Sequence, residues 1–144
     1  MKNIDNFMEV TMGQSMKKAD AGVSQYTTYL KPCLGVGIYN LKTDESYVGH
    51  YTDLMFFNFD KDMEVVKKDF SASNLLIFTA GGSFEKADKI YNESVLKDRK
   101  YVEKVLKENF SDAKINFRWS GVGEIVDLYL DKGKKEFVVE RNRK

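Results

Sequence analysis

Reactive and structure-breaking residues are scarce in this sequence. Its 144 residues include one cysteine, one histidine and one proline. Cys33 therefore cannot form a disulfide within the chain, and together with His50 it cannot supply the ligands of a structural zinc site. We expect no metal site and no cofactor. A single proline and 10 glycines also exclude collagen-like and proline-rich compositions.

An excess of charge of one sign is missing as well. The 23 Lys and Arg residues balance 22 Asp and Glu residues, which gives a formal net charge of +1. A chain this close to neutrality has no general attraction for nucleic acid. No stretch approaches the roughly 20 apolar residues of a membrane span, and the N-terminal segment has no apolar run of signal-peptide length. We expect no nucleic-acid partner, no membrane insertion and a cytoplasmic protein; export by a route without a cleavable signal stays open.

What is present is the composition of a folded domain. Hydrophobic residues make up 42% of the chain and charged residues 31%, which is enough apolar material for one core with a well-solvated surface. No linker-like segment, repeat or low-complexity tract divides the chain. We therefore expect a single domain over residues 1–144.

Strand character dominates the pattern. Alternating or β-branched and aromatic residues predict strands over Phe7 to Met12, Val23 to Leu30, Leu34 to Tyr39, Tyr47 to Phe59, Asn74 to Thr79, Ile115 to Trp119, Val126 to Leu130 and Glu136 to Val139. The last two strands flank a Lys132-Gly133 turn, which is typical of a β-hairpin.

Helical spacing occurs in two segments. One helix would bury Met63, Val66 and Phe70 behind an N-cap at Asp60, and a second would bury a face made of Tyr101, Val102, Val105, Leu106 and Phe110. The charges between Lys97 and Lys107 alternate in sign, which favours a solvated face over a binding patch. Strands and helices together predict an α+β fold, a layered sandwich of largely antiparallel sheets covered by two main helices.

Only two residues could supply nucleophile-and-base chemistry of the thiol type. A thiolate mechanism must use Cys33, and a histidine base must be His50. Their separation along the chain is a weak signal. From composition alone, a buried small hydrophobe and a hydrogen-bonded strand histidine are the more ordinary roles for these residues.

The sequence around both residues resembles the CheD family of chemotaxis protein glutamine deamidases. Cys33 lies in TTYLKPCLGVGIYN, between two predicted strands, and His50 lies in YVGHYTD on a further strand. In that family a cysteine opens a glycine-containing strand, a histidine lies on the next strand, and a threonine precedes the cysteine by six residues. Thr27 occupies the last position here, with Thr28 as its rival.

The likeness extends over most of the chain. Residues 10–14 (VTMGQ) are similar to the family's early Met-Gly-Glu segment, and the apolar run before Gly81 and Gly82 is similar to its Gly-Gly-Ala stretch. Gly81 and Gly82 are expected to form a tight turn beside the site, where they would bind the substrate; the simple end of a strand is the alternative. Trp119, Tyr51 and Phe84 are expected to serve packing rather than catalysis.

Two departures from the family pattern bear on function. Lys31-Pro32 replaces a small pair before the cysteine, and residues 51–54 replace an apolar, proline-ending segment. Because proline has no N–H, Pro32 cannot donate to an oxyanion and should instead hold the turn rigid. The backbone amides of Cys33 or Leu34 would have to serve.

The resemblance implies a cysteine-dependent deamidase that converts protein glutamine to glutamate through a thioester. Cys33 would be the nucleophile, His50 the acid and base, and Thr27 the group that orients His50 through its hydroxyl or carbonyl. The expected partners are a protein with an exposed glutamine, such as a chemoreceptor, and a regulatory protein. Toxins of the cytotoxic-necrotizing-factor and lethal-factor type offer a second setting with a host substrate. A catalytically silent adaptor on the same fold and an unrelated α+β protein, a cysteine protease included, are the alternatives.

Overall fold

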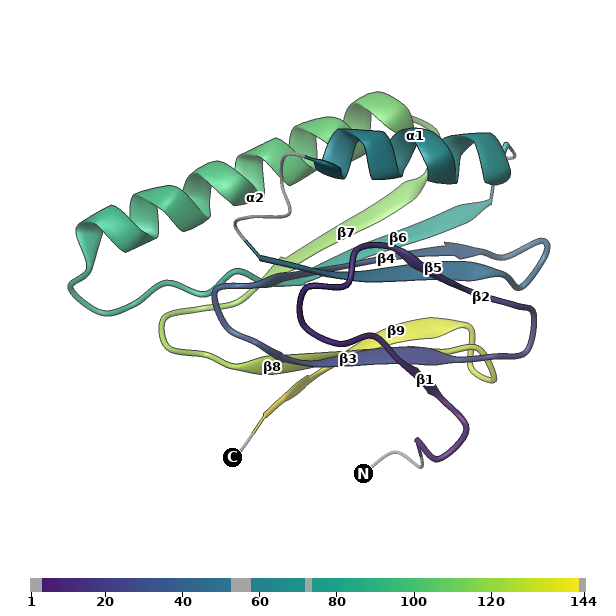
Figure 1. The fold of residues 1–144 in the computed structure, drawn as a ribbon, viewed down its shortest axis with the longest axis horizontal. Coiled ribbons are helices and arrows are strands. Elements are labelled where there is room, and N and C mark those ends of the chain that lie inside the picture. The colour runs from purple at the N-terminus through teal and green to yellow at the C-terminus, as the bar shows by residue number, and fades with distance from the viewer. Residues whose placement is uncertain (1–3, 53–57, 72–73, 143–144) are drawn as a thin grey trace.

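The computed structural model describes residues 4–52, 58–71 and 74–142, and these residues form three layers (Figure 1). The middle layer is a five-stranded sheet in the order β2-β5-β4-β6-β7. Its strands are β2 (Lys17–Ala19), β5 (Ser46–Tyr51), β4 (Leu34–Asn40), β6 (Leu75–Gly81) and β7 (Lys114–Trp119). Helices α1 (Phe59–Asp69) and α2 (Lys89–Asn109) cover one face of this sheet.

A four-stranded sheet covers the other face, in the order β1-β3-β8-β9. Its strands are β1 (Met8–Glu9), β3 (Gln25–Leu30), β8 (Val126–Asp131) and β9 (Glu136–Arg141). The pairs β1–β3 and β6–β7 are parallel, and the other strand pairs of the described residues are antiparallel. The predicted α+β class, a sandwich of largely antiparallel sheets and two helices, is confirmed, and so is the β8–β9 hairpin.

Several predicted boundaries are wrong. The strand expected to run from Tyr47 to Phe59 ends at Tyr51, Phe59 begins α1, and residues 53–57 lie outside the described part of the chain. The strand expected over Phe7 to Met12 is reduced to the two residues of β1. Strand β2 was not predicted because its sequence, KKA, is polar, and only its pairing with β5 at the sheet edge makes it a strand.

Both helix starts also differ from expectation. Asn58, not Asp60, occupies the N-cap position of α1, where it makes no side-chain capping bond. Asp60 lies within the first turn, where a carboxylate favourably meets the positive end of the helix dipole. Helix α2 begins at Lys89, well before its predicted apolar face, because its side-chain cap is Asp88, which accepts a hydrogen bond from the backbone of Tyr91.

The core between helices and sheet follows the predicted periodicity. Met63, Val66 and Phe70 are buried, as are all of the predicted α2 positions except the half-buried Tyr101. On the sheet side they meet Leu34, Val36 and Ile38 of β4. The lysines between Lys97 and Lys107 are exposed, in agreement with a solvated face.

Alternate residues of β4 face the second sheet, and two of them are glycines. Gly35 and Gly37 lie on the side of the cluster formed by Leu30, Leu128 and Phe137. A Cβ atom at Gly37 would overlap ring atoms of Phe137, and one at Gly35 would lie 2.7 Å from Leu30 Cδ1. The missing side chains therefore let the two sheets approach each other.

Substitution of Gly37 by alanine should destabilise the protein by about 1–3 kcal/mol, because the added methyl group must displace the Phe137 ring from a closely packed core. Urea unfolding followed by circular dichroism measures the change. Gly121→Ala is the matched control, since Gly121 is exposed and has open space at its Cβ position. Equal stability of the two variants would contradict this account of the sheet contact.

Candidate active site

Cys33 lies in the short connection between β3 and β4, directly before the first residue of β4. Its carbonyl oxygen accepts a hydrogen bond from the amide of Gly82 at 3.0 Å. The carbonyl of Lys31 accepts two further bonds from Ser83, one from its amide at 2.6 Å and one from its hydroxyl at 2.9 Å. The segment after β6 thus holds the turn on both sides of Pro32, which fits the rigid role predicted for this proline.

The strand register places Cys33 and His50 on the same face of the sheet. Gly35 of β4 is paired with His50 of β5, and Leu34 with Tyr51. Because side chains alternate along a strand, Cys33 points to the side of Gly35, where it joins the core between the two sheets. Cys33 and His50 are then diagonal neighbours on adjacent chain segments. Gly35 places no side chain opposite the imidazole ring.

Thr27 reaches His50 from the other sheet. Its hydroxyl oxygen lies 2.6 Å from the carbonyl oxygen of Val10 and 2.7 Å from Nδ1 of His50. A hydroxyl has one proton, and only donation to the Val10 carbonyl leaves both contacts favourable. The Thr27 oxygen therefore accepts a hydrogen bond from Nδ1–H of His50. This fixes the tautomer and leaves Nε2 with its lone pair.

The environment of His50 favours the neutral ring. The residue is 1% exposed, and Nε2 has no hydrogen-bond partner among the residues that the structure describes. Burial lowers the pKa of His50 from 6.5 to about 4, because desolvation disfavours the imidazolium ion. At neutral pH the ring is thus a proton acceptor at Nε2.

The orientation of His50 depends on a segment whose role the sequence did not reveal. The amide of His50 donates to the carbonyl of Gln14 at 2.9 Å. A turn over residues 11–14 brings this carbonyl into place, with Gly13 at a φ of +83° and the amide of Thr11 donating to the Gln14 side chain at 2.8 Å. The likeness of residues 10–14 to a family segment was the available signal, but it did not assign their contacts.

The choice between Thr27 and Thr28 is made by the pleat of β3. Thr27 is fully buried and bonded to His50, whereas Thr28 is half-buried. The hydroxyl, not the carbonyl, of Thr27 makes the contact. The structure thus joins Thr27 and His50 between the sheets and places Cys33 on the same side of the five-stranded sheet.

Gly81 and Gly82 lie beside Cys33 with φ values of +85° and +63°. A Cβ atom at Gly81 would overlap the Cys33 carbonyl oxygen. Ser120 donates its amide to the Gly81 carbonyl at 2.8 Å, and the guanidinium of Arg99 donates to the Gly82 carbonyl. The two glycines form a tight turn that contacts the backbone of the cysteine, and contact with a substrate remains a prediction.

The three aromatic residues that the sequence assigned to packing, Tyr51, Trp119 and Phe84, make packing contacts. The ring of Tyr51 is buried on the helix side of the sheet, and its hydroxyl donates to Asp62. Trp119 packs against the same core, and Phe84 lies under the guanidinium of Arg99 at 4.2 Å.

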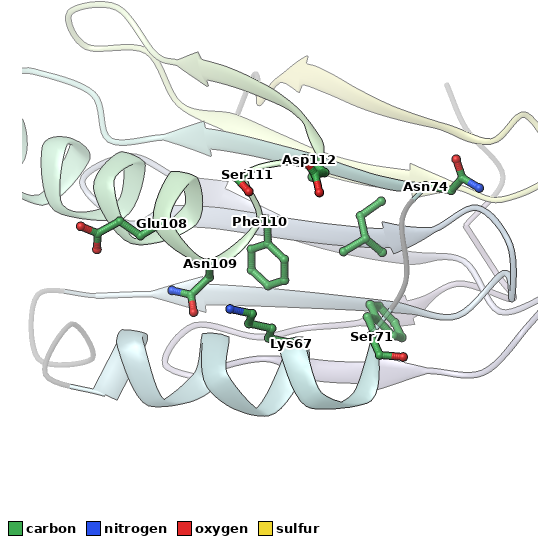
Figure 2. Close-up of a pocket in the computed structure, with 11 residues that line it drawn as sticks. Lys67, Ser71, Asn74, Glu108, Asn109, Phe110, Ser111 and Asp112 are labelled. Atoms are coloured by element: carbon green, nitrogen blue, oxygen red, sulfur yellow. The ribbon is translucent and has the colours of Figure 1, made fainter.

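A separate pocket of about 430 Å³ opens where α1 and α2 both end (Figure 2). Residues from the last turns of the helices and from the segments after them line it, and Cys33, His50 and Thr27 are not among them. Within residues 4–52, 58–71 and 74–142, no three His, Cys, Asp or Glu side chains are grouped to hold a metal ion. The same part of the chain contains no helix with the length and apolarity needed to cross a membrane.

Comparison with known proteins adds no relative: no protein-family model matches the chain, and no curated protein has a significantly similar sequence.

Replacement of Thr27 by valine should destabilise the protein by about 1–3 kcal/mol, because the buried Val10 carbonyl and the His50 Nδ1–H group both lose their partner. Thr28→Val is the control, and its change should stay within about 0.5 kcal/mol. Denaturant unfolding distinguishes the two. A Thr27→Val protein as stable as the control would contradict the two buried hydrogen bonds assigned to Thr27.

Acid should weaken the fold through His50. Between pH 6.5 and about 4 the unfolded chain binds a proton at this residue and the folded chain does not, so stability falls as pH falls through this window. The loss attributable to His50 is about 3 kcal/mol between pH 7 and pH 4.

The unfolding free energy of His50→Asn, measured over the same range, should lose this component of the pH dependence. The asparagine amide can still donate to Thr27 but does not titrate. An identical pH dependence in both proteins would show that His50 is not held neutral by burial.

Proposed function

We propose that this protein is a cysteine-dependent protein glutamine deamidase of the CheD type. The observation that supports this most strongly is the buried Thr27–His50 pair, in which Nε2 has no partner among the described residues and lies on the face of the sheet where Cys33 lies. A structural histidine of a core would satisfy both ring nitrogens, because an unpaired buried polar atom is costly. A histidine that takes the proton of a thiol needs such a free lone pair.

In the proposed reaction, Nε2 of His50 takes the proton of the Cys33 thiol. The thiolate attacks the side-chain carbonyl carbon of a glutamine and forms a C–S bond, while the carbonyl π electrons move to oxygen. Backbone amides at the start of β4, those of Cys33 or Leu34, would hold this oxyanion. When the tetrahedral intermediate collapses, the C–N bond breaks and His50 returns its proton to the nitrogen, which leaves as ammonia.

Water completes the cycle. His50 removes a proton from a water molecule, the hydroxide attacks the thioester, and the C–S bond breaks to release glutamate and the thiolate, which His50 reprotonates. One amide and one water thus become one carboxylic acid and one ammonia. Thr27 keeps Nδ1 protonated throughout and so keeps Nε2 available, the role that a carboxylate has in other triads.

The low pKa of His50 sets a condition on this scheme. An imidazolium ion is unfavourable at a site buried to this degree, so the ring should charge only when the thiolate forms beside it. The proposal therefore describes a neutral thiol–imidazole pair at rest, in which the proton moves when the substrate binds.

A catalytically silent adaptor is the second candidate. Cys33 is only 6% exposed, and Pro32 replaces a residue that could donate a backbone hydrogen bond next to it. Both features fit a protein that kept the fold and binds a regulatory partner without turning over a substrate. We propose a cytoplasmic location, with a chemoreceptor as the substrate; a host protein attacked in the manner of the related toxins is the alternative setting.

Ammonia release tests the proposal directly. The wild-type protein is incubated with glutamine-bearing proteins, among them chemoreceptor cytoplasmic domains, and the products are mapped by mass. A gain of about 1 Da at a glutamine, absent with Cys33→Ala, is the expected result for a thioester route. His50→Asn should lower the rate about 100-fold or more, because it removes the acid and base.

Thiol reactivity separates the two candidates. At pH 7 the alkylation of Cys33 by iodoacetamide should be faster in the wild type than in His50→Asn, since Nε2 assists loss of the thiol proton. Equal, slow alkylation in both proteins, together with no ammonia from any substrate, would favour the adaptor.

A further inference from the structure

The backbone of β3 is irregular between the residues that serve the active site. Strands β3 and β8 shift register between Thr27 and Leu30, a β-bulge that places two residues where one is expected. Without it, Thr27 and Leu30 would point to opposite faces; with it, both are fully buried. The bulge therefore lets Thr27 reach His50 and Leu30 fill the core beside Gly35.

Within this bulge, Tyr29 has a strained backbone conformation. Its φ is +61°, a left-handed conformation that is unfavourable for a large side chain. Among the described residues with positive φ that are not glycine, it is the one inside a strand. The amide of Tyr29 is fixed there by the carboxylate of Asp127, at 2.9 Å. Glycine or asparagine would fit this position with less strain.

The ring of Tyr29 belongs to neither hydrophobic core cluster of the described residues. Tyr29 is 49% exposed, and its hydroxyl makes no hydrogen bond within the described part of the chain. Along the chain it precedes Cys33 by four residues, just before the turn that carries the cysteine. In the segment from Thr27 to Cys33, Tyr29 and Pro32 are the exposed residues. An exposed aromatic side chain is thus held four residues before the cysteine, at a cost in backbone strain.

We propose that Tyr29 is a specificity residue that contacts the polypeptide on either side of the target glutamine. Its ring packs against the substrate backbone, so the enzyme acts on glutamine within a protein and discriminates against free glutamine. Aromatic side chains supply such contacts because they give a large rigid surface with few rotatable bonds. This inference rests on the proposed deamidase function and adds a residue that selects protein-bound glutamine.

The test compares Tyr29→Asn with the wild type on a chemoreceptor cytoplasmic domain that the wild type deamidates, and on free L-glutamine. Asparagine accepts the left-handed conformation, so the variant should be as stable as the wild type or more stable. We expect kcat/KM for the protein substrate to fall about 10-fold, mainly through KM, because a contact of this size is worth about one tenfold step in affinity. The rate on free glutamine and the alkylation rate of Cys33 should not change. Tyr29→Phe keeps the ring and should keep the activity.

Lys135→Asn is the matched control. Lys135 is another exposed residue with positive φ, at 54°, but it lies in the β8–β9 turn. Its replacement should give the same thermal behaviour with no change in kcat/KM. An active wild type with an equally active Tyr29→Asn would overturn this inference alone. A wild type that releases ammonia from neither substrate would overturn the deamidase proposal and this inference with it. If Tyr29→Asn were less stable than the wild type, Tyr29→Gly would replace it in the test. The same 10-fold fall in kcat/KM for the protein substrate is expected of Tyr29→Gly, and an unchanged value would overturn the inference.

Discussion

The hydroxyl of Thr27 joins three separate parts of the chain at one buried point. It donates to the Val10 carbonyl after β1 and accepts from the His50 ring on β5, so it links the N-terminal segment, the four-stranded sheet and the five-stranded sheet. None of the three groups is accessible to water, and each would be left unsatisfied without the others. The relative position of the two sheets at this end of the sandwich is therefore constrained by polar geometry as well as by apolar contact.

That constraint can be met only because the sheets come close together. Gly35 and Gly37 remove two side chains from the middle of the interface, and Leu30 and Phe137 occupy the space from the opposite sheet. In a regular strand, Thr27 and Leu30 would point to opposite faces. The bulge in β3 lets both of them face inward. Strain at Tyr29 accompanies this solution. The close approach of the sheets, the Thr27 hydrogen bonds and the strain at Tyr29 therefore depend on one another.

The layer formed by α1 and α2 has a different role. It buries the apolar face of β4 and β6 and keeps the charged side of α2 in water, on the face of the sheet opposite the Thr27–His50 pair. The connection between this layer and the site runs through the segment after β6, where Arg99 of α2 binds the Gly82 carbonyl and Gly82 binds the Cys33 carbonyl. The turn that carries the cysteine is thereby fastened to the helical side of the molecule.

The sequence by itself determined the fold class, both buried helix faces, the terminal hairpin and the short set of residues able to do thiol chemistry. These follow from periodicity and from the presence of one cysteine and one histidine, which are local or compositional properties. It did not determine β2, whose polar residues become a strand only by pairing with β5, or the start of α2, which depends on a cap at Asp88.

Nor did it determine which threonine meets His50, or that the Val10 and Gln14 carbonyls orient the pair. Those contacts join residues on different strands and sheets, and their geometry depends on a strand register and a bulge that no local pattern encodes. Only the tertiary structure decided that Nε2 of His50 is buried and meets no hydrogen-bond partner from residues 4–52, 58–71 and 74–142, because burial is a property of the assembled layers.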